Sequence, residues 1–137
     1  MNGILSEWRE LFGSAAGRSP RTSFWLGFAF LFMLSVLYEA LTYGNPLKLL
    51  TFWFVYPLLW WAAACVVSKR LHDRGRSGWW AALVLVAFAL VWPNTHGVWT
   101  VFGVAVLVWT LVELGIMPGE PGANRYGPSP RAEPAGA

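Results

Sequence analysis

The stretch KRLHDRGRSGWW, residues 69–80, determines how the rest of this chain is arranged. It carries five basic or titratable side chains and one acid, and a long apolar run lies on each side of it. The five are Lys69, Arg70, His72, Arg74 and Arg76, and the acid is Asp73. A short basic segment between two apolar runs is typical of a loop between membrane-spanning helices. The flanking runs are therefore candidate spans.

The composition favours lipid as the solvent of this chain. Of the 137 residues 56% are hydrophobic and 12% are charged, whereas roughly a quarter are charged in a soluble domain. A soluble domain of this length buries only part of its surface, so much apolar material would face water. The ten Trp residues agree, since Trp is enriched where hydrocarbon meets water. The single cysteine, Cys65, cannot form an internal disulfide.

Four apolar segments qualify as spans, and together they form a membrane domain over residues 23–117. The segments are residues 23–43, 47–68, 78–92 and 98–117. The third is short, because its rise of about 22 Å falls below the roughly 30 Å hydrocarbon core. A helix that begins in the basic loop, with Arg76 extending to the surface, or a thinner bilayer would close this gap. We expect an all-α membrane protein with four transmembrane helices.

The two ends of the chain differ from this membrane domain. Residues 1–22 begin with a short amphipathic helix whose apolar face carries Ile4, Leu5, Trp8, Leu11 and Phe12. Such a helix lies along the membrane surface or packs against the bundle, and the pattern leaves both open. Residues 118–137 contain five prolines and four glycines, a composition that predicts a loose tail.

The positive charges predict the orientation of the chain. With four spans, nine of the ten lysines and arginines lie on one side, and Lys48 alone lies opposite. The nine are Arg9, Arg18, Arg21, Lys69, Arg70, Arg74, Arg76, Arg125 and Arg131. Positive charge is retained in the cytoplasm, so both termini are expected there. The same rule explains why the chain carries an excess of basic residues, so this excess does not indicate a nucleic-acid partner.

The basic loop is the surface where we expect contact with another molecule. If the second span continues and stops near Gly75, Arg70 and Arg74 share a helix face. Their like charges repel unless a lipid phosphate, or a carboxylate such as Glu113, lies between them. Lys69 and Asp73 are also four residues apart and are expected to pair. The alternative is an ordinary loop solvated by water and lipid headgroups.

The acids within the predicted spans are candidates for function or for structural ion pairs. Glu39 lies within reach of Lys48 at the outer end, and Glu113 lies near the basic loop. For Glu113 we favour the structural role, because a transport path usually shows polar groups near the middle of the membrane.

The pair His72–Asp73 invites a catalytic interpretation, which the rest of the chain does not support. No nucleophile motif accompanies the pair, and the predicted topology places His96 on the opposite face of the membrane. A metal or catalytic site needs several converging groups. We therefore expect no catalytic residue, no metal, no cofactor and no enzymatic activity.

Three segments resemble one known family. They are GRSPRTSFW at residues 17–25, RLHDRGRSGWW at residues 70–80 and GEPGANRYGPSP at residues 119–130. Together they resemble the small bacterial inner-membrane proteins grouped as domain of unknown function 805, over roughly residues 11–130. The resemblance implies a four-span membrane protein and carries over no catalytic residue. It directs attention to Arg70, His72, Asp73, Gly75, Ser77, Gly78, Asn124, Tyr126 and Gly127. It also suggests that residues 124–128 dock as a turn under the basic loop, with Tyr126 stacked on an arginine.

The resulting expectation is a non-enzymatic component of the bacterial inner membrane. Its partners would be the bilayer, anionic phospholipid, and a membrane-protein partner or a second copy, with no nucleic acid. The candidate contact residues are Arg70, His72, Asp73, Arg74, Arg76, Glu113, Arg125 and Tyr126. The alternative is a small oligomeric transporter or channel, which a liposome flux assay distinguishes.

The charge bias predicts the outcome of a reporter-fusion experiment. A fluorescent reporter that matures only in the cytoplasm is expected to be bright when fused after Ala137, because the basic segments hold that end inside. The same reporter fused after Asn45, in the predicted outer turn, should stay dark. Activity of a periplasmic phosphatase fused after Ala137 would contradict the predicted topology.

Overall fold

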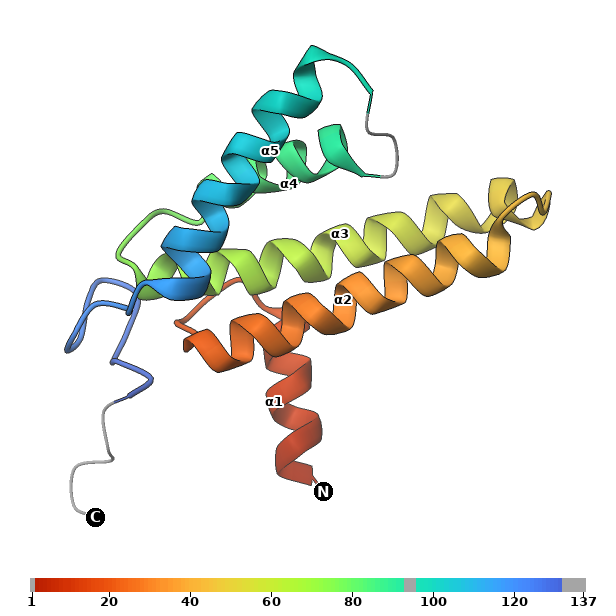
Figure 1. Cartoon of the computed structure of the whole chain (residues 1–137). Helices are drawn as coiled ribbons and strands as arrows, with labels where there is room; N and C mark the ends of the chain where they lie inside the picture. Colours follow the sequence, from red (N-terminus) through yellow and green to blue (C-terminus); the bar gives the residue numbers. More distant parts are fainter. Residues whose placement is uncertain (1, 93–95, 132–137) are drawn as a thin grey trace.

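The computed structural model describes residues 2–92 and 96–131, and the regular structure in these residues is helical. Its elements, shown in Figure 1, are α1 (Asn2–Gly13), α2 (Arg21–Thr42), α3 (Leu47–Asp73), α4 (Trp80–Val91), α5 (Val98–Thr110) and η1 (Leu111–Ile116). The last is a π-helical segment that continues α5. The all-α class predicted from hydropathy is confirmed for the described residues.

Three helices are long and apolar enough to cross a membrane: α2, α3 and α5 together with η1. Helix α4 has 12 residues, a rise of about 18 Å, so the third predicted span forms a helix over only part of its length. Much of the apolar surface is exposed, with Leu49, Phe54 and Leu58 each more than three-quarters accessible. Large exposed apolar faces of this kind are suited to contact with lipid chains.

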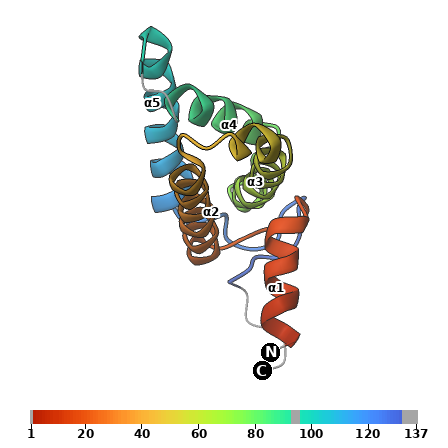
Figure 2. The same cartoon turned by 90° about the vertical axis from the view of Figure 1, so that its right-hand side faces the viewer.

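The helices form two antiparallel pairs, α2 with α3 and α4 with α5 (Figures 1 and 2). The start of α2, the end of α3, the start of α4 and the end of η1 gather at one end of the molecule, at the left of Figure 1. We call this end the basic end. The buried core lies toward it and consists of Phe24, Val66, Val67, Leu71, Ala81, Val84 and Leu114.

Polar contacts hold the opposite tip, where α2 turns into α3. The Lys48 ammonium lies 2.6 Å from the Glu39 carboxylate, which confirms the ion pair expected from their spacing. The Tyr56 hydroxyl also donates to Glu39, and the hydroxyls of Tyr38 and Thr51 lie 2.9 Å apart. These bonds link the two helices where few other polar groups are available.

Helix α1 leaves the α2–α3 pair at a steep angle in both views (Figures 1 and 2). Leu11 and Phe12 pack against the core, and the Trp8 ring meets Phe30 edge-on with centroids 5.3 Å apart. Ile4 and Leu5 are about 60% exposed. The second half of α1 therefore packs against the bundle, while contact of its first half with the membrane surface stays a prediction.

The contact between α4 and α5 predicts a destabilising substitution. In Gly103→Ala the added Cβ would lie 2.8 Å from the Ala87 carbonyl oxygen and 2.9 Å from a methyl group of Val91. Overpacking of this kind costs about 1–3 kcal/mol, so the thermal midpoint in detergent should fall. Gly3→Ala, whose Cβ would meet nothing within 4 Å, is the control. Equal midpoints for the two variants would show that α4 and α5 are not packed this closely.

Candidate functional site

The basic end is built on the C-terminus of α3, which continues past the predicted span limit at residue 68 to Asp73. Gly75 follows with φ +70°, a conformation that favours glycine. The amide of Arg76 bonds to the Leu71 carbonyl (2.9 Å), and the amide of Gly75 bonds to the His72 carbonyl (3.0 Å). This pair of bonds is a Schellman motif. The helix therefore ends beside Gly75, beyond the predicted limit of the span, which was the condition under which Arg70 and Arg74 would share a helix face. The motif places Arg70 and Asp73 on the helix.

Arg70 and Asp73 form a buried ion pair one helical turn apart, with 0% and 1% of their side chains exposed. The Arg70 guanidinium donates to the Asp73 carboxylate and to the carbonyl oxygens of Leu114 and Met117, both at 2.7 Å. Burial of a charge is tolerated when ion pairs and hydrogen bonds compensate it. Arg70 thereby fixes the end of α3 against η1, and none of its side chain remains open to an outside phosphate.

Arg18, in the connector before α2, supplies the second partner of Asp73. Two of its nitrogens lie 3.0 and 3.1 Å from Asp73 Oδ1. Its guanidinium also donates to the carbonyl oxygens of Glu120 and Gly122, each at 2.7 Å. We call Arg18, Asp73 and Arg70 the buried triad. Arg18 was absent from the sequence-based contact residues, although it lies within the GRSPRTSFW segment.

The triad and its neighbours hold the tail in place. Besides the bonds from Arg18, the amide of Glu120 bonds to the Asp73 carbonyl at 2.7 Å. Composition alone predicted a loose tail, and this is wrong for residues 119–127, which are docked; the family resemblance suggested docking only for residues 124–128. The reason is that a long-range arginine satisfies the backbone carbonyls of the tail. Residues 132–137 lie outside the described part of the chain.

The turn at residues 124–127 covers His72. The rings of Tyr126 and His72 are stacked 3.8 Å apart with an interplanar angle of 8°, and the Asn124 amide donates to the His72 carbonyl (2.9 Å). Nδ1 of His72 lies 3.0 Å from the Gly17 carbonyl, to which it donates. The docking of this turn is confirmed. The stacking partner of Tyr126 is a histidine, however, and the arginine over its ring is Arg125, at 4.7 Å.

Two further arginines share one carboxylate. Arg74 and Arg76 each lie 3.0 Å from Oε1 of Glu113, which confirms the structural ion pair expected for Glu113. The expected pair between Lys69 and Asp73 is wrong. Lys69 faces α1, where its ammonium meets the Glu10 carbonyl and lies 3.8 Å from the Glu10 carboxylate. Asp73 instead takes two arginines, whose forked donors match a carboxylate better than an ammonium does.

Exposure divides the predicted contact residues into two groups. Arg70, Asp73 and Glu113 are buried. Arg76 keeps 41% of its side chain exposed and lies over the rings of Trp80 and Trp109 at 6.0 and 5.7 Å. The exposed arginines of the described chain at this end include Arg21, Arg125 and Arg131. No group of three potential metal ligands occurs among the described residues.

Comparison with known proteins identifies relatives over most of the chain. The family model "Protein of unknown function (DUF805)" matches residues 12–128. The uncharacterized protein YiiR of Escherichia coli K12 is 38% identical over 122 residues, which cover 83% of this chain and 84% of the relative. The inner membrane protein YhaH of the same strain is 30% identical over 127 residues, covering 86% and 88%. No solved structure matches.

The contacts of Arg18 predict the protease sensitivity of the tail. In Arg18→Gln the tail loses charge-assisted hydrogen bonds worth about 1.5–3 kcal/mol each. Because proteases cut locally unfolded segments, trypsin cleavage after Arg125 should accelerate roughly tenfold or more. Arg9→Gln, on the exposed surface of α1, should leave the rate unchanged. Equal cleavage rates for wild type and Arg18→Gln would show that Arg18 does not hold the tail.

Proposed function

The chain belongs to the DUF805 family of proteins of unknown function, and we propose that it is a non-enzymatic inner-membrane component that binds anionic phospholipid headgroups through exposed arginines at its basic end. The inner membrane is supported by the relative YhaH, which is named an inner membrane protein, and by the three long apolar helices. Because the family is described as one of unknown function, membership does not indicate an activity. The proposed binding role is therefore argued from the charges at the basic end.

The proposed topology has four crossings with both termini in the cytoplasm. In its favour, four helix ends and nearly all basic residues gather at one end of the molecule, and Lys48 lies at the other. Helix α4 (Trp80–Val91) is the short crossing. Trp79 precedes it with 86% of its side chain exposed, as expected for a residue at the level of the headgroups.

The observation that carries the proposal is the excess of positive charge that remains after internal pairing. The basic residues at this end are Arg18, Arg21, Lys69, Arg70, Arg74, Arg76, Arg125 and Arg131, and the acids are Glu10, Asp73, Glu113 and Glu120. The buried triad and Glu113 neutralise only part of this charge. Arg76, which lies over the rings of Trp80 and Trp109, and the exposed arginines at this end form a surface that suits phosphate at the headgroup level.

The alternative role as a transporter or channel receives less support. A polar path through the membrane would show polar side chains between the helices. The cavity between the helix pairs is instead lined almost entirely by aromatic and aliphatic side chains. A partner protein at the basic end is compatible with the same charges, but lipid phosphate is the anion that every copy in a bilayer meets.

Neutralising three of the exposed arginines should weaken the preference for anionic lipid. In the triple variant Arg76→Gln, Arg125→Gln and Arg131→Gln, each lost charge removes about 1 kcal/mol of attraction to an anionic surface. Spin-labelled phosphatidylglycerol and phosphatidylcholine, added to the reconstituted protein, report how strongly each is immobilised. Wild type should favour phosphatidylglycerol, less so at high salt, and the triple variant, which retains Arg21, should favour it much less.

Lys48→Gln, at the opposite tip, is the matched control and should keep the wild-type preference. A triple variant that still selects phosphatidylglycerol as strongly as wild type would remove the support for headgroup binding at this surface.

A further inference from the structure

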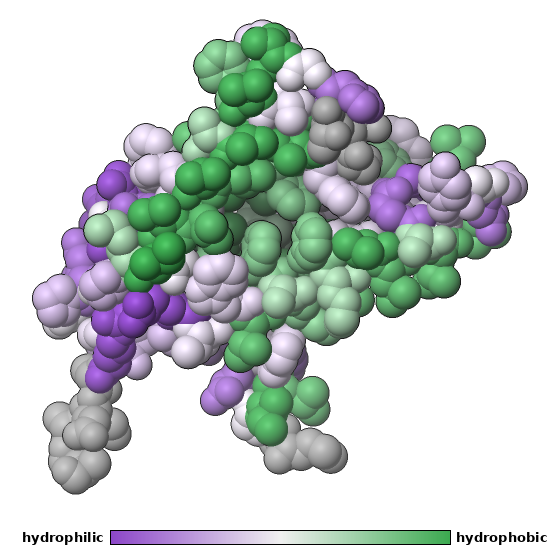
Figure 3. Space-filling model, viewed as in Figure 1, coloured by the Kyte–Doolittle hydropathy of each residue, from purple (hydrophilic) through white to green (hydrophobic). Residues whose placement is uncertain are grey.

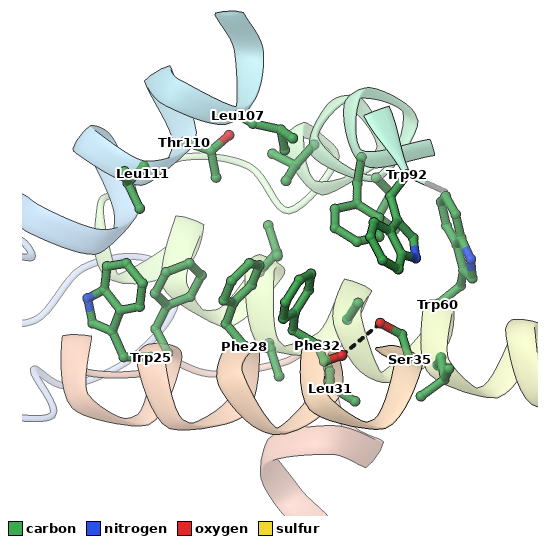
Figure 4. A pocket seen from close by; sticks show the side chains of 18 of the residues that line it. Trp25, Phe28, Leu31, Phe32, Ser35, Trp60, Trp92, Leu107, Thr110 and Leu111 are labelled. Carbon is green, nitrogen blue, oxygen red and sulfur yellow. Dashed lines mark hydrogen bonds between the residues drawn. The ribbon is translucent and has the colours of Figure 1, made fainter. Parts of the chain in front are cut away.

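A cavity of about 360 Å³ lies between the α2–α3 pair and the α4–α5 pair (Figure 4). The rings of Trp25, Phe28 and Phe32 project into it from α2. Leu107 of α5 and Leu111, the first residue of η1, face them. Helix α3 forms its floor, and α4 closes its far side. Figure 3 shows the corresponding hollow between the apolar surfaces of α2 and α5. We call this cavity the slot.

Contacts close the slot at both ends. At the basic end the Trp25 indole donates to the Gly115 carbonyl at 3.0 Å, which joins α2 to η1. At the other end the Phe32 ring meets Trp92, with centroids 5.8 Å apart. Among the described residues, α2 and α5 do not pack against each other between these points. The slot is therefore open sideways, in the direction that faces lipid when α2 spans the membrane.

The length of the slot matches one leaflet of a bilayer. Its α2 wall runs from Phe24 to Ser35, a rise of about 16 Å, and half of the hydrocarbon core is about 15 Å. A single flexible hydrocarbon chain fits this length.

Arg21 lies just beyond the basic end of the slot. It precedes Trp25 by one helical turn on the same face of α2, and one of its terminal nitrogens donates to the Ile116 carbonyl at 2.8 Å. This bond anchors the guanidinium, while the residue as a whole stays exposed. A fixed guanidinium with N–H groups directed outward is suited to bind a phosphate.

We propose that the slot holds one acyl chain of an anionic phospholipid of the cytoplasmic leaflet, and that Arg21 binds the phosphate of that lipid. The proposal rests on the membrane topology and the anionic-lipid role proposed above, and it adds a defined site with one bound lipid. The apolar walls offer no partner for a polar substrate, and an empty slot would forfeit the dispersion contacts of its lining side chains. Charge at one end and hydrocarbon along the rest match the two parts of a phospholipid.

The test is native mass spectrometry of the full chain, extracted into mild detergent from vesicles of equal parts phosphatidylglycerol and phosphatidylcholine. Wild type should carry one phospholipid per chain, mainly phosphatidylglycerol. Ala63→Phe places a ring in the floor of the slot and should lower the lipid-bound fraction about tenfold or more, because excluding two chain methylenes already corresponds to that factor. Ala62→Phe, which faces the wedge between α1 and α3, should retain the lipid.

A second pair of variants tests the same site independently, in case the first pair does not fold. Val104→Phe fills the slot from the α5 wall, and Val101→Phe places the same ring on an exposed face of α5 outside the slot. Helical circular dichroism and monodisperse elution establish folding for each variant. Lipid retained at the wild-type level by folded Ala63→Phe or Val104→Phe would overturn the proposal. So would a lipid-free dimer of wild type that Ala63→Phe converts to monomer, because a second copy would then fill the slot.

The headgroup is tested separately with Arg21→Gln. This variant should keep a bound lipid but hold phosphatidylglycerol and phosphatidylcholine equally, whereas Lys48→Gln, at the opposite tip, should keep the preference for phosphatidylglycerol. An unchanged preference in Arg21→Gln would overturn the assignment of the phosphate to Arg21. The spin-label experiment measures all the lipids around the protein, so it tests the proposed headgroup surface and not the single lipid in the slot. A negative result for one hypothesis is therefore distinguishable from a negative result for the other.

Discussion

The buried triad of Arg18, Asp73 and Arg70 is the interaction on which the rest of this structure depends. A carboxylate removed from water requires full compensation, and Asp73 receives it from two guanidinium groups. Their remaining donors bind carbonyls of η1 and of the tail. Loss of Asp73 would leave two buried cations unpaired, which typically costs 3–5 kcal/mol. One short side chain thus ties together four segments: the connector before α2, the end of α3, η1 and the tail.

This arrangement explains why the buried core lies toward one end of the bundle. In a bilayer, apolar side chains gain little by leaving lipid for each other, so polar contacts and close packing must specify how helices associate. At the basic end, arginine bonds draw the helix ends together, and Leu71 and Leu114 become fully buried beside them. Away from that end no such bonds join α2 to α5, and the two pairs of helices separate around the slot.

The ordinary helix signals and the arginine contacts act together at the end of α3. The Schellman motif at Gly75 stops the helix within one turn of Asp73, so the chain reverses and Arg76 returns to Glu113. Gly119 passes directly against the Asp73 carboxylate, where a Cβ has no room. The GRSPRTSFW, RLHDRGRSGWW and GEPGANRYGPSP segments, which carry the family resemblance, are therefore the segments that meet at the basic end.

Hydropathy, charge and short spacings were sufficient to predict the apolar helices and the ion pairs of Glu39 and Glu113. These properties depend on neighbours within a few turns or on which end of a span a residue occupies. The ion-pair partners that are distant in the sequence could be identified only from the tertiary structure. Lys69 and Asp73 have the spacing of a pair, yet Lys69 binds Glu10 and Asp73 binds Arg18, 55 positions away. Among several arginines of equal charge, the relative placement of helix ends selects the partner, and local sequence does not encode that placement.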